Sequence, residues 1–195
     1  MPSLLAKQPG VCNLRAGGSV RASGYHVSDL LRSRAIRGKL LPADDEELDF
    51  ASTDPKRQQA AHRRVQLGLA FESRLEVERQ DILFHPGERT HSGIAYNIDG
   101  RNKSDGRLVE CKLTWKSSRH NILYIFLWMM QVKAYLYADA DLSPEVDFHV
   151  YWVMGDYSWR GPIYEIITIA FTHEECEQAW EFLELEREYL ERKIA

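Results

Sequence analysis

Apolar positions recur along this 195-residue chain with two different periods, and turn residues separate the segments that carry them. A period near two, with many β-branched and aromatic residues, predicts strands over 81–85, 93–98, 107–114, 146–154 and 163–171. A period near 3.6 predicts helices over 29–37, 55–79, 121–138 and from residue 173 onward. Their order along the chain favours an α/β fold in which a central mixed sheet is flanked by helices.

The second predicted helix has the clearest start, with Asp54 as its N-cap and Pro55 at the first helical position. Its inward side should consist of Val65, Leu67, Leu69, Phe71 and Leu75. Ser28 is placed to cap the first helix, and Thr172 the last, with Glu175 completing a capping box. We expect residues 1–54 to form an N-terminal arm with one short helix on a core of 55–195, within a single domain.

The central segment 92–116 is predicted to form a hairpin from the strands 93–98 and 107–114, joined by a polar turn over 101–106. This hairpin brings Asp99 close to Glu110. Strict alternation in the second strand places Leu108, Glu110 and Lys112 on one face and apolar residues on the other.

Glu110 and Lys112 are charged residues in a strand that is otherwise suited to burial, and buried charges need partners or a metal ion. Two carboxylates in proximity favour a hard divalent cation such as magnesium, and a nearby ammonium can orient water or offset charge on a phosphate. The chemistry suggested is metal-assisted attack of water on a phosphodiester. The alternative is an ordinary hairpin with an exposed Glu–Lys pair.

The surrounding motifs distinguish these alternatives. Asp99, ten intervening residues and Glu110-Cys111-Lys112 resemble the catalytic signature of the PD-(D/E)xK nuclease superfamily. Gly68-Leu-Ala-Phe-Glu72 resembles the G-x-x-x-E helix, and Gln131-Val-Lys-Ala-Tyr135 the Q-x-x-x-Y helix, of its RecB-like and lambda-exonuclease-like (YqaJ-type) branches. All four elements occur in the family's order over about a third of the chain. Ile98 departs from the pattern, since the family name has proline there.

The resemblance implies a restriction-endonuclease-like αβββαβ core with an N-terminal helical extension. It implies that Mg²⁺ or Mn²⁺ is held by Glu72, Asp99, Glu110 and the main-chain carbonyl of Cys111. It also implies that Lys112 positions or activates water, and that Gln131 supports the site. Glu76, one turn after Glu72, is the other candidate for the upstream acidic ligand.

The function implied is a metal-dependent deoxyribonuclease, most simply an exonuclease acting in DNA recombination, DNA repair or phage DNA processing. The alternatives are a structure- or sequence-specific endonuclease on the same fold, and a non-catalytic nucleic-acid-binding protein that retains it. DNA is the expected partner, with a recombination or helicase protein as a further one. The expected setting is the cytoplasm of a bacterial host, with a phage origin.

The positions of the charged residues along the chain are more informative than the net charge. The formal net charge is -4, and the last predicted helix carries many glutamates. Basic residues gather near the proposed site instead, which is compatible with a phosphate-binding surface. The residues expected to contact nucleic acid are Arg101, Lys103, Lys116, Arg119 and Tyr135.

The remaining composition excludes several classes of protein. The three cysteines Cys12, Cys111 and Cys176 are widely spaced, which favours reduced thiols and excludes a four-cysteine iron–sulfur cluster. His85, His91 and His120 fit no compact zinc motif. No apolar run reaches the ~20 residues of a membrane span, and we expect no secretory signal.

Overall fold

In the computed structural model, residues 24–38, 54–115, 126–153 and 164–194 are described. The main sheet has five strands in the order β2-β5-β6-β7-β8. Their bounds are β2 Ile82–Phe84, β5 Gly100–Asn102, β6 Leu108–Trp115, β7 Glu145–Val153 and β8 Tyr164–Ala170. Because β6 and β7 are parallel and the other neighbours antiparallel, the sheet is mixed.

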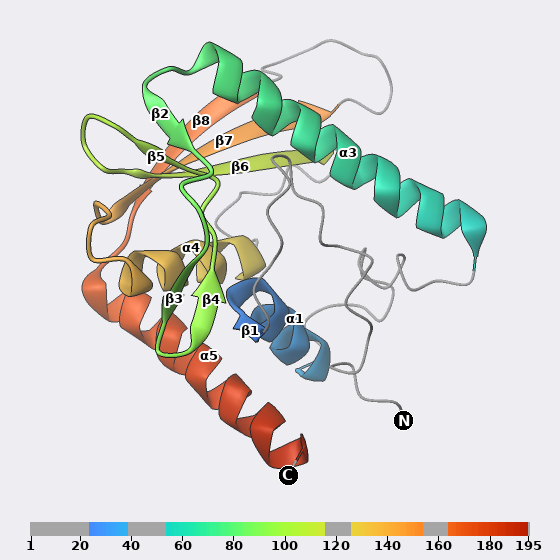
Figure 1. The fold of residues 1–195 in the computed structure, drawn as a ribbon, viewed down its shortest axis with the longest axis vertical. Coiled ribbons are helices and arrows are strands. Elements are labelled where there is room, and N and C mark those ends of the chain that lie inside the picture. Colours follow the sequence, from blue (N-terminus) through green and yellow to red (C-terminus); the bar gives the residue numbers. More distant parts are fainter. Residues whose placement is uncertain (1–23, 39–53, 116–125, 154–163, 195) are drawn as a thin grey trace.

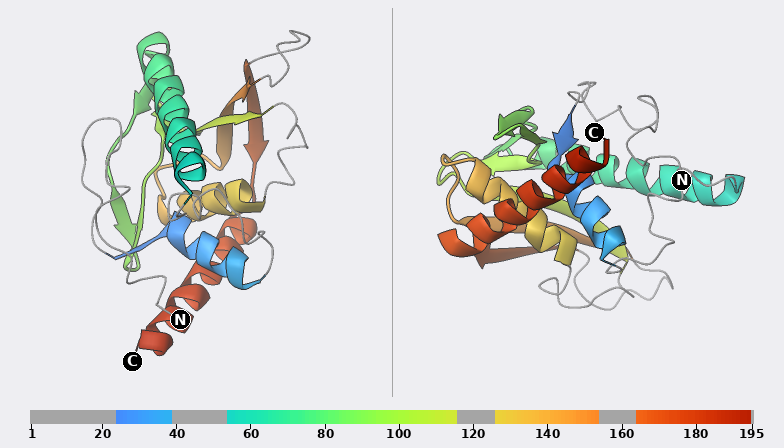
Figure 2. Two further views of the ribbon diagram at one scale, coloured as in Figure 1. Left: turned by 90° about the vertical axis from the view of Figure 1, so that its right-hand side faces the viewer. Right: turned by 90° about the horizontal axis from the view of Figure 1, so that it is seen from below.

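Helices lie on both faces of this sheet (Figures 1 and 2). One face carries α3, Pro55–Glu78, and the other carries α4, Phe126–Ala138, with α5, His173–Ile194, behind it. The short α1, Val27–Arg37, packs beside α4 and α5. The predicted α/β architecture is therefore confirmed. The main sheet and its helices keep the expected αβββαβ order of α3, β2, β5, β6, α4 and β7, while β3 and β4 of the second sheet lie between β2 and β5 in the chain.

Two apolar cores follow from the alternation along β6. Leu108 belongs to the larger core, which lies on the side of α4 and α5 and includes Phe148 and Trp180. Val109 and Cys111 belong to the smaller core, beneath Leu75 of α3. The alternation predicted for this strand is therefore correct, and Glu110 emerges on the side of α4.

The predicted hairpin is wrong in one strand. Residues 93–98 contain β4, Ile94–Tyr96, which pairs with β1, Tyr25–His26, and β3, Arg89–His91, in a separate three-stranded sheet. The antiparallel partner of β6 is instead β5, which begins directly after Asp99. A side chain at Gly100 would place its Cβ 2.8 Å from Ile82 Cγ2, so only glycine lets β5 lie against β2 at that point.

The starts of α3 and α5 follow the capping rules. Asp54 accepts a hydrogen bond from the Lys56 amide, and the Thr172–Glu175 capping box is formed at α5. α1 begins at Val27, directly after β1, two residues before the start expected with Ser28 as its cap.

The inward side predicted for α3 is correct only in its second half. Leu75 is 4% exposed, whereas Val65 and Leu67 are 41% and 48% exposed. The first turns of α3 project beyond the sheet (Figure 1), so none of the described strands lies beneath them. In the described part of the chain, no helix is long and apolar enough to cross a membrane.

A buried ion pair holds α1 against α5. The Glu186 side chain is fully buried, accepts a hydrogen bond from Ser33 Oγ at 2.9 Å and pairs with the Arg37 guanidinium. The same guanidinium lies over the Tyr189 ring, 4.0 Å from its centroid. Since a buried carboxylate needs such partners, these contacts fix the position of α1 on the core.

Candidate active site

The site is built on the middle of β6, where the strand leaves its partner β5. The pairing of β5 with β6 extends only to Gly100 opposite Val109. Beyond that point the Glu110 side chain is 1% exposed, and its Oε1 contacts the Lys112 ammonium, itself only 17% exposed. These two charges are therefore a buried, mutually neutralising pair rather than the exposed pair of the alternative interpretation.

Asp99 occupies the edge of β6 that β5 has left. Its Oδ2 accepts a hydrogen bond of 2.9 Å from the main-chain amide of Cys111. In a strand, the N–H and C=O of one residue point to the same side, so the Cys111 carbonyl faces the same edge as Asp99. Two of the predicted metal-ligating oxygen groups, a carboxylate and a main-chain carbonyl, thus lie at one edge.

Glu72 reaches the site from α3. Its side chain is 19% exposed, and its Oε2 lies 4.0 Å from Nε2 of His85. Glu76, the other candidate, is exposed on the helix surface. Glu72 is therefore the acidic residue of α3 that faces the site.

His85, which the sequence analysis considered only for a zinc motif, lies beside Glu72. It has a φ of 46°, a left-handed conformation that is uncommon for residues other than glycine and that gathers at functional sites. Its amide donates to the main-chain oxygen of Asp99 at 2.9 Å. Its Nε2 is buried and, within the described residues, makes no hydrogen bond. The only signal in the sequence is a histidine at the end of a predicted strand, directly before Pro86-Gly87.

The charges of these side chains shift the pKa values of Cys111 and Lys112. Burial raises the pKa of the Cys111 thiol, and the negative charges of Asp99, Glu72 and Glu110 raise it further. Burial alone would lower the pKa of Lys112, but Glu110 and Asp99 outweigh it and the pKa is raised. Lys112 is therefore a cation at neutral pH, and the thiol stays protonated.

The chemical types of these donor groups are those that bind divalent cations. Carboxylates and a main-chain carbonyl are the ligands of Mg²⁺, while an imidazole nitrogen also suits transition ions. Two ligands of one ion, each about 2.1 Å from it, can be up to about 4.2 Å apart, and Glu72 and His85 are separated by 4.0 Å. In the described part of the chain, no three acidic, histidine or cysteine side chains are already close enough to form a metal group. Binding therefore requires the carboxylates to shift toward one another.

Gln131 and Tyr135 form a unit on α4. The Gln131 amide nitrogen donates to the Tyr135 hydroxyl at 2.7 Å, and the Tyr135 ring lies 5.9 Å from that of Tyr96. Tyr135 is only 4% exposed, so it belongs to the packed interior. In this position its hydroxyl contacts Gln131, and the predicted contact of Tyr135 with nucleic acid stays a prediction.

The other residues predicted to bind nucleic acid lie at the periphery or outside the described chain. The Arg101 guanidinium donates to the main-chain oxygen of Asp141 at 2.6 Å, and the Lys103 ammonium to that of Gln80 at 2.7 Å. Both cations are thus engaged near the turn between β5 and β6. Lys116 and Arg119 lie in 116–125, outside the described residues.

One solved structure resembles this fold. No protein-family profile matches the sequence, and no curated protein is significantly similar to it. The structure of SSO0001 has 17% identity and a TM-score of 0.50, over 85% of this chain and 76% of that one. At this identity the likeness is one of fold alone.

Two structures named as exonucleases align more loosely. LHK-Exo of Laribacter hongkongensis in complex with dAMP has 19% identity and a TM-score of 0.46, over 88% of this chain and 93% of that one. A phage related exonuclease from Haemophilus somnus 129PT has 12% identity and a TM-score of 0.48, over 90% and 98%.

Proposed function

We propose that this chain is a divalent-metal-dependent DNA nuclease that hydrolyses phosphodiester bonds. The observation that carries the proposal is the buried Glu110–Lys112 pair beside the Asp99–Cys111 hydrogen bond, at the open edge of β6. Burying this many charged groups costs several kcal/mol unless they serve one another or a ligand, so such clusters are typical of functional sites. The motifs that resemble the PD-(D/E)xK superfamily contribute these same residues.

The residues that would hold the cation are Glu72, Asp99, Glu110 and the Cys111 carbonyl, and we add His85 to this set. Bound Mg²⁺ or Mn²⁺ supplies Lewis-acid stabilisation of a phosphodiester oxygen and favours ionisation of an attacking water. The orphaned Nε2 of His85, 4.0 Å from Glu72, supports a site that accepts a nitrogen ligand. This donor set suits Mn²⁺ better than Mg²⁺, which prefers oxygen.

Lys112 has the role of a cationic hydrogen-bond donor in this proposal. The negative charges of Glu110 and Asp99 raise its pKa, which favours the ammonium form, and an ammonium is a hydrogen-bond donor. It can orient the attacking water or donate to a phosphate oxygen, whose negative charge increases in the transition state. Gln131, fixed by the Tyr135 hydroxyl, orients groups on the α4 side of the same site.

Exonuclease action is the mode that we favour, on the resemblance of the Gln131–Tyr135 helix to the branches that act on DNA ends. The same resemblance predicts a recombination or helicase partner and a role in phage DNA processing.

Digestion of linear and covalently closed circular duplexes with Mn²⁺ or Mg²⁺ tests both the nuclease activity and the exonuclease mode. We expect mononucleotide release from the linear duplex and an intact circle. Cutting of the circle would contradict the exonuclease mode and favour an endonuclease. Absence of cleavage of any DNA form with either ion would contradict the nuclease itself.

A further inference from the structure

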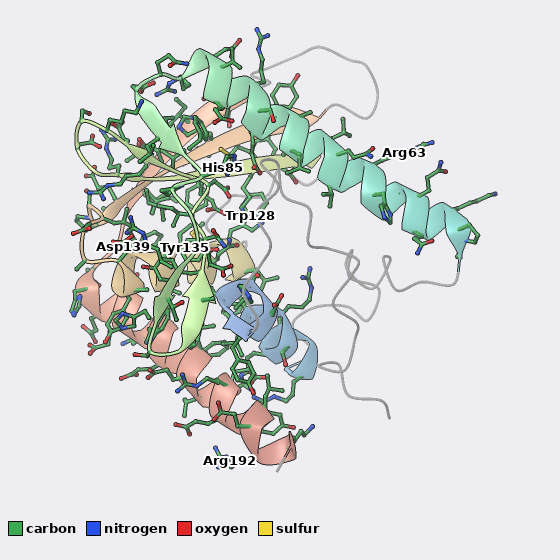
Figure 3. The ribbon with its side chains drawn as sticks, viewed as in Figure 1. Arg63, His85, Trp128, Tyr135, Asp139 and Arg192 are labelled. Atoms are coloured by element: carbon green, nitrogen blue, oxygen red, sulfur yellow. The ribbon has the colours of Figure 1, made fainter. Side chains whose placement is uncertain are left out.

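One face of α4 carries three polar or aromatic side chains in a row. Trp128, Gln131 and Tyr135 are spaced by three and four residues, so they share a side of the helix. The last two are joined by a hydrogen bond and form the supporting unit of the proposed site. Trp128 has no counterpart in the motifs described above. In Figure 3 it lies between α4 and the strands of the main sheet.

Trp128 contacts the site through Lys112. The Lys112 Nζ lies over the indole, 5.5 Å from the ring centroid, which is within the range of a cation–π interaction. The same ammonium contacts Glu110. With 17% of its side chain exposed, Lys112 is held between a carboxylate and an aromatic face.

These two contacts respond differently to a divalent cation. If Glu110 binds such an ion, its negative charge is shared, and the ion repels the ammonium directly. The contact with Glu110 must then weaken at the moment when Lys112 is needed. The indole is uncharged and is not among the proposed ligands, so its attraction for the ammonium persists.

We propose that Trp128 is a positioning residue that keeps the Lys112 ammonium at the reacting phosphate when Glu110 holds the metal ion. This inference rests on the proposed nuclease function and goes beyond its ligand set and motifs. It requires the face of an aromatic ring at residue 128, not merely an apolar side chain. A purely structural Trp128, which also borders the larger core, would require volume only.

Two substitutions at this residue distinguish the effect of the aromatic ring from the effect of side-chain volume. Trp128→Phe keeps a π face over Lys112, while Trp128→Leu keeps only an apolar side chain. We expect Trp128→Leu to lower kcat for DNA cleavage about tenfold with KM little changed. Trp128→Phe should keep most of the native kcat. Equal rates for the two variants, or a loss confined to KM, would overturn the inference.

Phe126→Leu is the matched control. Phe126 lies in the same helical turn, is 40% exposed and packs against Phe182, 6.2 Å away, on the side of α5. The substitution removes an aromatic ring from the turn without removing the ring over Lys112. We expect native kcat. A loss equal to that of Trp128→Leu would mean that the turn as a whole, and not the contact with Lys112, is responsible.

A measurement that needs no catalysis tests the contact itself. The rate at which an amine-reactive succinimidyl ester labels Lys112, followed by peptide mass spectrometry at one pH with and without Mn²⁺, reports how firmly the ammonium is held. We expect labelling several-fold faster in Trp128→Leu than in Phe126→Leu, most clearly with Mn²⁺ present. Equal rates would overturn the inference. If the native chain cleaves no DNA, the proposed function fails, and labelling still decides whether Trp128 holds Lys112.

Discussion

The Asp99 carboxylate accepts a hydrogen bond from the main-chain amide of Cys111, 2.9 Å away and twelve residues further along the chain. This contact replaces the one that β5 would have made had it continued alongside β6. It fixes Asp99 beside the strand that carries Glu110 and Lys112, so three motif residues occupy one edge. The Gly100–Val109 pair is the last one before this edge, so a change there should displace Asp99 relative to Glu110.

Glu72 and Glu76 provide a direct comparison within α3. Glu72 lies 4.0 Å from His85, whereas Glu76 is exposed one turn further on. If Glu72 is a metal ligand, Glu72→Gln should lower kcat about 100-fold and raise the Mn²⁺ concentration needed for half-maximal rate. Glu76→Gln, the same chemical change, should leave both within about twofold of native. Titration of rate against Mn²⁺ checks this, and similar losses in both variants would remove Glu72 from the site.

His85 should contribute to the choice of metal ion. Its buried Nε2 is a nitrogen donor, which transition ions accept more readily than Mg²⁺. We expect His85→Ala to weaken Mn²⁺ binding about tenfold in calorimetric titration and to affect Mg²⁺ less. His91→Ala is the control, because His91 packs against Trp180 in the other sheet region, 5.0 Å between ring centres. Unchanged Mn²⁺ affinity in His85→Ala would exclude the histidine as a ligand.

Gly68 precedes Glu72 by one helical turn, and an added Cβ there would meet nothing within 4 Å. Glycine inside a helix costs about 0.5–1 kcal/mol relative to alanine. We therefore expect Gly68→Ala to stabilise the chain by about that amount in urea unfolding. If the open surface admits the DNA backbone beside Glu72, KM for DNA should rise in the same variant. Greater stability with unchanged KM would leave the glycine without a role in binding.

His149 should make stability depend on pH. It is 1% exposed, its Nδ1 lies 2.6 Å from the Tyr164 hydroxyl, and burial, with the charge of Arg79, lowers its pKa from 6.5 to about 4. The unfolded chain therefore binds the proton more readily, and stability that is complete above pH 6.5 is lost as the pH falls toward 4. The shift corresponds to about 3 kcal/mol.

The measurement for His149 is the free energy of unfolding in urea between pH 7 and pH 4.5. The native chain should lose stability over this range, and His149→Gln should flatten the dependence. His62→Gln, at an exposed histidine of α3, should retain the native dependence. A native slope in His149→Gln would assign the pH dependence to other groups.

The sequence predicted those features that depend on local chemistry. The alternation of β6 required Glu110 and Lys112 to share a face, and capping residues located the starts of α3 and α5. The motif order identified Asp99 and Glu72 as candidates, because their spacing from Glu110 resembles that of the PD-(D/E)xK pattern. These residues converge in the structure, although their roles stay predictions.

The features that the sequence missed depend on long-range packing. Residues 93–98 have an apolar strand pattern, but nothing local shows that β4 pairs with β1, some seventy residues upstream, instead of with β6. Val65 and Leu67 fit the apolar period of α3, yet the sheet ends before it reaches them. His85 joins the site because its main chain pairs with that of Asp99, a contact without a periodic signature.

The most direct test of the central claim is cleavage of end-labelled linear duplex DNA with Mn²⁺, comparing the native chain with Glu110→Gln and Lys112→Met. Circular dichroism of each variant establishes that it is folded. We expect metal-dependent release of nucleotides by the native chain and a loss of at least 100-fold in both variants, because each removes a charge from the buried pair at the edge of β6. Native-like cleavage by either folded variant, or no metal-dependent cleavage by the native chain, would contradict it.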